Sequence, residues 1–191
     1  MADFTVTNTN DSGAGSLRQA IADANAAGGK DRIVFTIADG STITLTSGEL
    51  SVTEALEIAG NVDGTATDQD ITVTADGRSR VFAFTSGSTD SSIDGLAITG
   101  GALSGDGGNF TTSNPATGLG ESALGAGIFN DGTLVITNSA ISGNAAAAGG
   151  AGANFSGGGG GFAGLTNSVG GDGGGGAYGS AGGSGTTSGG G

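Results

Sequence analysis

The sequence contains no cysteine, histidine or tryptophan, and its 191 residues include a single proline. Without cysteine or histidine there is no thiolate nucleophile, no serine–histidine pair, no zinc site of the usual ligands and no histidine ligand for haem. Positive charge is also scarce, with 5 basic against 18 acidic residues and a net charge of −13. No basic patch can neutralise phosphates, so we expect no nucleic-acid partner.

Long apolar runs are absent too. No stretch approaches the roughly 18–20 apolar residues of a transmembrane helix, so we expect no membrane insertion by this segment. Glycine, by contrast, supplies 44 residues, 9 of them in residues 1–80 and 35 in residues 81–191. These glycines keep no three-residue period and there is one proline, which excludes a collagen helix.

One amphipathic helix is expected near the N-terminus, after a short strand over residues 3–8. Ser16 is placed to cap it, and Leu17, Ala20, Ile21 and Ala24 fall at the i, i+3, i+4 and i+7 positions of one face. The helix should span residues 16–27, because two consecutive glycines then end it.

Short alternating apolar runs follow, with separations too short for helical crossovers. They predict many short strands, as in a sandwich, a barrel or a solenoid. The expected strands cover residues 33–37, 42–46, 50–52, 56–58, 71–74, 81–84, 93, 96–98, 128–129 and 134–141.

An internal repeat favours the solenoid. Residues 96–106 (LAITGGALSGD) align with residues 134–144 (LVITNSAISGN), every position 38 apart. In a solenoid each strand pairs with its equivalent in the next coil, at about 4.8 Å. We therefore expect these two segments to stack on one another, with glycine and asparagine at the corners where positive φ is needed.

The N-terminal region resembles the cap of bacterial right-handed parallel β-helix surface and secreted proteins. The resemblance rests on residues 4–13 (FTVTNTNDSG), 15–21 (GSLRQAI) and 24–25 (AN). Residues 80–82 leading to 95–101 (GLAITGG) resemble the first coils of such proteins. Residues 125–134 (GAGIFNDGTL) and 149–152 (GGAG) are similar to elements of polymorphic outer-membrane adhesins.

The resemblance, which covers residues 3–155, implies an all-β right-handed parallel β-helix with a short N-terminal capping helix and a glycine-rich C-terminal segment. We expect a cap at residues 1–34, β-helix coils at residues 35–155, and glycine-rich degenerate coils or a tail at residues 156–191. The family combines adhesins and autotransporter passengers, so it implies an extracellular or cell-surface location more firmly than any activity.

Four acidic residues are the candidate calcium ligands. Asp63, Asp68, Asp70 and Asp76 cluster in a loop-rich stretch and offer the oxygen ligands that Ca²⁺ takes. Their spacing matches no EF-hand, and solvated surface acids are the simpler interpretation. No other cofactor is expected.

Parallel β-helices also host polysaccharide lyases, which makes a carbohydrate-active enzyme the alternative function. Arg78 and Arg80 are the basic residues beside a strand in this region, and Asp76 with Arg80 is the one candidate catalytic pair. A surface ion pair at a coil corner explains the same residues. We expect no enzyme activity.

Three Thr-x-Thr segments occur, at residues 5–7, 42–46 and 72–74. Stacked in register, such threonines form the flat face of some ice-binding solenoids, although threonine is also simply favoured on exposed strand faces. The copies are unevenly spaced along the chain, which disfavours ice binding.

The expected function is a non-catalytic structural or adhesive segment of a bacterial surface or secreted protein. Its partners are expected to be surface glycans, or further copies of the chain stacked end to end through the C-terminal edge, because no closing cap follows the last expected coil.

Overall fold

The computed structural model describes residues 1–62, 69–105 and 123–147. The chain divides into two compact units: Met1–Ala102 with Gly125–Ala145, and Leu103–Leu124 with Ala146–Gly191. The first unit is almost completely described. The boundary expected at residue 155, and the segment beyond it, lie outside the described residues.

The one helix of the described residues is α1 (Leu17–Ala27), which follows the short strand β1 (Asp3–Val6). Ser16 caps it, its side chain accepting a hydrogen bond from the Gln19 amide at 3.2 Å. The helix ends at Gly28, whose φ of 72° other residues adopt only with strain. Its buried residues are the expected ones: Leu17, Ala20, Ile21 and Ala24. The predicted helix is confirmed.

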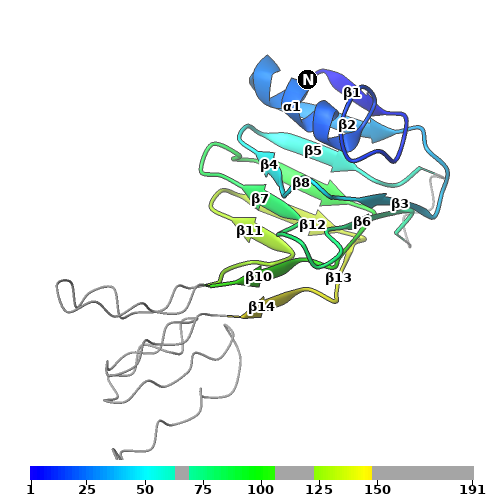
Figure 1. Cartoon of the computed structure of the whole chain (residues 1–191). Coiled ribbons are helices and arrows are strands. Elements are labelled where there is room, and N and C mark those ends of the chain that lie inside the picture. Colours follow the sequence, from blue (N-terminus) through cyan, green and yellow to red (C-terminus); the bar gives the residue numbers. More distant parts are fainter. Residues whose placement is uncertain (63–68, 106–122, 148–191) are drawn as a thin grey trace, which may run out of the picture. The chain divides into compact units, whose positions relative to one another are not determined.

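The strands form parallel sheets, and three of these make up most of the first unit (Figure 1). The first sheet has the order β1, β2 (Asp31–Phe35), β5 (Leu56–Ala59), β8 (Ser91–Asp94), β12 (Leu134–Thr137). The second sheet has the order β3 (Ser41–Thr44), β6 (Ile71–Thr74), β9 (Leu96–Thr99), β13 (Ala140–Ile141). The third sheet has the order β4 (Leu50–Val52), β7 (Phe82–Phe84), β11 (Ile128–Asn130). Two further strands pair separately: β10 (Ala102–Ser104) and β14 (Ala145–Ala147).

The chain visits the three sheets in rotation. After β2 it contributes β3 to the second sheet and β4 to the third, and then β5 returns to pair with β2. The next passage, β5 to β7, adds one strand to each sheet in the same order. The predicted mostly β architecture of stacked parallel strands with one short helix is confirmed.

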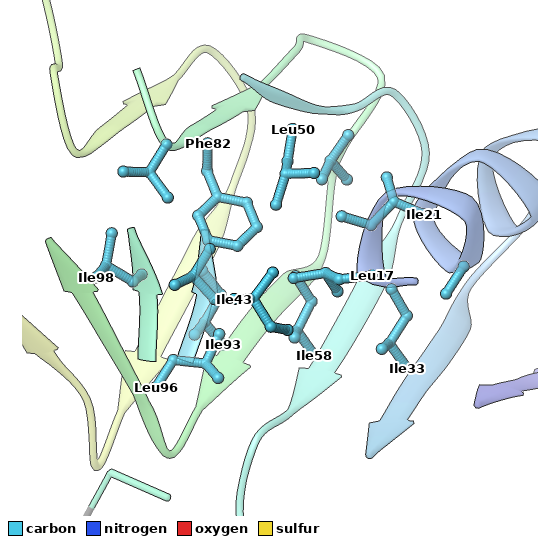
Figure 2. Close-up of a cluster of buried hydrophobic side chains, with 14 of the residues drawn as sticks. Leu17, Ile21, Ile33, Ile43, Leu50, Ile58, Phe82, Ile93, Leu96 and Ile98 are labelled. Atoms are coloured by element: carbon cyan, nitrogen blue, oxygen red, sulfur yellow. The ribbon is translucent and has the colours of Figure 1, made fainter. Parts of the chain in front are cut away.

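Inward side chains stack in columns because the strands are in register. Ile33, Ile58 and Ile93 occupy one column of the first sheet, and each is 0% exposed. Figure 2 shows this column beside Phe82 and Leu17, within one continuous hydrophobic core. Alternation of apolar and small polar residues along each strand produces this arrangement, since successive side chains point to opposite faces.

The register expected from the 38-residue repeat is wrong. Leu134 pairs with Ser91 in the first sheet, and Ala140 pairs with Ala97 in the second, a separation of 43 residues in both cases. Leu-x-Ile-Thr therefore occurs once in each of two different sheets, and its recurrence does not mark equivalent strands.

The corners of the chain explain the true register. Gly95 precedes β9 with a φ of 70°, and its equivalent Asn138 precedes β13 with a φ of 47°. Gly100 and Gly143, 43 residues apart, each have a φ of 65°. Glycine and asparagine adopt positive φ with the least strain. The backbone therefore turns at equivalent positions in the two passages of the chain. The expected strand over residues 134–141 is accordingly two strands, β12 and β13, divided at Asn138.

Candidate functional site

The four predicted calcium ligands are only partly described. Asp63 and Asp68 lie outside the described residues. Asp70 is 1% exposed, and its Oδ2 accepts a hydrogen bond from the Val62 amide at 2.6 Å. Asp76 is exposed, with an Oδ2 atom 3.2 Å from Nη1 of Arg78. Asp70 thus has a structural role and Asp76 a surface one, and the calcium site stays a prediction.

Asp76 and Arg80, the candidate catalytic pair, each have a different ion-pair partner in the structure. Asp76 pairs with Arg78, while Nη1 of Arg80 lies 2.6 Å from Oε2 of Glu49. Arg80 also donates from Nε to the Gly125 carbonyl at 2.9 Å, and its guanidinium carbon lies 5.0 Å from the centre of the Phe129 ring. Arg80 therefore joins segments of the third-sheet region.

A partly buried ion pair attaches the helix to the chain that follows it. Arg18 donates from Nη2 to Oδ1 of Asp11 at 2.8 Å and to the Gly48 carbonyl at 2.7 Å. Its Nη1 donates to the Glu49 carbonyl at 2.7 Å. A guanidinium is suited to this because its five donors form a rigid fork. Since the Glu49 side chain pairs with Arg80, one polar network runs from the helix towards β7.

Asp11 is the acidic centre of this network. Thr46 donates to its Oδ2 at 2.9 Å, and Ser47 donates to the same oxygen. Burial raises the pKa of Asp11, but the hydrogen bonds from Ser47, Arg18 and Thr46, together with the Arg18 charge, outweigh it. The pKa of the carboxyl is therefore held well below its ordinary value of 3.8.

Acid should weaken the fold through Asp11. A carboxyl with a depressed folded-state pKa gives its full stabilisation well above its unfolded pKa of 3.8 and loses it progressively as pH falls from there through the lower folded-state pKa. We expect Asp11→Asn to lower the free energy of unfolding by about 2 kcal/mol at pH 7 and by less than half of that at about pH 2. Urea denaturation at both pH values measures this, and an equal deficit at each would contradict the assignment.

A side-chain amide of the same helix covers the edge of the third sheet. Asn25 donates from Nδ2 to the Ser51 carbonyl at 2.9 Å, and its Oδ1 accepts from the Thr53 amide at 3.0 Å. These are the two backbone groups that a neighbouring strand would satisfy. Exposed strand edges invite pairing with other chains, so Arg18 and Asn25 protect the edge of β4.

Replacing Asn25 should expose that edge. We expect Asn25→Ala to lower the free energy of unfolding by about 1–2 kcal/mol, because two hydrogen bonds to the strand edge are lost. Gln19→Ala is the matched control: Gln19 lies on the same helix, and its side chain donates to the exposed Asp23 at 2.7 Å. Its cost should stay below about 0.5 kcal/mol. Urea denaturation followed by circular dichroism measures the stability of both variants. Equal losses of unfolding free energy would contradict the edge-protecting role of Asn25.

A hollow of about 260 Å³ lies between α1 and β4. It is lined by Arg18, Ile21, Ala22, Asn25, Glu49, Leu50 and Ser51. Arg18, Asn25 and Glu49 in its lining already make the hydrogen bonds and ion pairs described above. The hollow therefore results from the packing of α1 against β4 and, within the described residues, offers no further polar group of this size.

The other end of the first and second sheets is different. Their last described strands, β12 and β13, carry large exposed apolar side chains: Val135 is 57% exposed, Ile136 38% and Ile141 50%. Ile136 and Ile141 continue the columns of Ile93 and Ile98, which are both fully buried. The helix thus protects one end, while apolar columns emerge at the other.

Threonines lie in register on the outward face of the second sheet. Thr42 is paired with Thr72, and Thr44, Thr74 and Thr99 occupy one continuous column. The uneven spacing of these segments along the sequence therefore does not prevent residues 42–44 and 72–74 from stacking. The segment at residues 5–7 does not join them, because Thr5 lies on β1 of the first sheet.

Within the described residues, no three acidic side chains come close enough to share a metal ion. No helix in that part of the chain is both long and apolar enough to cross a membrane. No protein-family model, curated protein or solved structure matches the chain. The support for a function therefore comes from the chain's own residues and their arrangement.

Proposed function

We propose that the chain is a non-catalytic structural and adhesive segment of a bacterial surface or secreted protein, folded as a right-handed parallel β-helix. The observation that carries this proposal is the in-register stacking of three parallel sheets, protected by a helix at one end and apolar at the other. A right hand follows from the strong preference of parallel crossovers for that hand.

The two ends support a modular, stalk-like role. Arg18 and Asn25 cover the edge of β4. Within the described residues, β12 and β13 are the last strands of their sheets, and they carry the exposed Val135, Ile136 and Ile141. Further coils or a second copy would continue the columns there. The net charge of −13 opposes non-specific attachment to anionic surfaces, so adhesion must come from specific contacts.

A glycan array probed with the whole chain tests this function. Retention on surface glycans, with no release of unsaturated or newly reducing ends from acidic polysaccharides, is the expected result. Release of such products would overturn the proposal in favour of a lyase or hydrolase. A blank array would exclude glycan adhesion.

A further inference from the structure

The outward positions of the second sheet form an uncharged strip, which we call the threonine face. Its members alternate with the inward-facing residues of each strand: Thr42, Thr44, Thr72, Thr74, Ala97, Thr99 and Ala140. The chain holds 23 charged residues, but none occupies these positions. The equivalent face of the first sheet carries Arg32, Glu57 and Asp94.

The threonine face presents hydroxyl groups on a regular grid. Neighbouring strands are about 4.8 Å apart, and alternate residues of one strand about 6.6 Å apart. Threonine side chains are stiff at χ1, so the grid is preorganised. Each hydroxyl both donates and accepts hydrogen bonds, and therefore complements other hydroxyls without requiring a charge.

Two chemical features restrict the ligand. The absence of cations on the face, within a chain of net charge −13, disfavours acidic polymers. The repetition of identical hydroxyls favours a polymeric ligand whose chemical groups also repeat. An uncharged polysaccharide has this property, and many weak contacts along it sum to useful avidity.

We propose that the threonine face binds an uncharged, hydroxyl-rich polysaccharide lying flat across β3, β6 and β9. The inference rests on the proposed adhesive function, for which it specifies the binding face and the ligand class. Thr72 is central because β6 lies between β3 and β9. Thr74 is less suited to a test, since its hydroxyl also accepts from the Asp76 amide at 3.1 Å.

Co-sedimentation of the whole chain with microcrystalline cellulose, and separately with calcium alginate beads, tests the inference. The wild type should sediment with cellulose and not with alginate. Thr72→Glu, which places a bulky charge in the face, should weaken cellulose binding at least about tenfold, a loss near 1.4 kcal/mol. Thr72→Val, which removes only the hydroxyl, should weaken it less. Thr5→Glu is the matched control, since Thr5 is an exposed threonine on β1 of the first sheet, and should bind as the wild type does.

The possible outcomes distinguish a wrong ligand or binding face from a wrong adhesive function. Wild-type binding that Thr72→Glu leaves intact, in a variant with an unchanged circular dichroism spectrum, would overturn the threonine face while preserving adhesion. Binding to alginate alone would overturn the uncharged ligand. If the chain sedimented with neither and instead slowed ice recrystallisation in a Thr72-dependent way, the face would bind ordered water and the inference would be wrong. If the glycan array also showed no binding, the proposed adhesive function would be wrong as well.

Discussion

Replacing Leu17 by aspartate should open the N-terminal end of the core and cause the chain to associate. Leu17 is 0% exposed, and Figure 2 shows its side chain beside Ile33 and Ile58 of the first sheet. A carboxylate there would be buried without a partner, which belongs to the few changes that cost more than about 4 kcal/mol. Because a domain is stable by only about 5–15 kcal/mol, the helix should detach or the whole unit unfold.

Light scattering and urea denaturation measure this effect together. We expect Leu17→Asp to scatter as a concentration-dependent oligomer and to lose most of its urea resistance. Ala26→Asp introduces the same charge on an exposed position of the same helix and should cost less than about 1 kcal/mol. A monomeric Leu17→Asp variant of near wild-type stability would show that the helix does not seal the core.

Removing the Phe82 ring should produce the second large effect. Phe82 is 0% exposed and lies between Leu50 and Ile128 on the paired strands of the third sheet. Its ring centre is 6.0 Å from that of Phe84, so truncation leaves a cavity in the centre of the core. We expect Phe82→Ala to lower the free energy of unfolding by about 3–5 kcal/mol.

Phe129→Ala provides the comparison, because Phe129 lies on the adjacent strand but faces outwards beneath Arg80. Its loss should cost about 1–2 kcal/mol, the scale of a partly buried cation–π contact. Denaturation must be followed by far-ultraviolet circular dichroism because the chain has no tryptophan. Equal losses for the two variants would contradict the inward and outward assignment of these rings.

Local features of the sequence predicted the elements well. The stripe of Leu17, Ala20, Ile21 and Ala24 gave the helix, and apolar alternation gave most strands within two residues of their ends. The helical stripe and the strand alternation both involve residues only a few positions apart in the sequence. Backbone geometry fixes the periodicity of side chains over such short distances. The three-residue strands β10 (Ala-Leu-Ser) and β14 (Ala-Ala-Ala) carry too little alternation to be predicted in this way.

Register and the polar network could not be predicted in the same way. The pairing of Ala140 with Ala97 depends on the lengths of the intervening connections, which leave no periodic trace. The Arg18 and Asn25 side chains bond to backbone groups that lie 26 to 31 residues further along the chain. Their spacing of seven residues on one helix face was a usable signal, because it places both towards the same neighbour.

The 43-residue register defines how the last described passage of the chain stacks on the one before it. Engineered cysteines test it directly in a chain that contains none. In-register parallel strands place Cα atoms about 4.8 Å apart, within the range of a disulfide. Under mild oxidation, Ala97→Cys with Ala140→Cys should therefore cross-link within one chain, while Ala102→Cys with Ala140→Cys, 38 residues apart, should not. Cross-linking of the second pair and not the first would contradict the stacking described above.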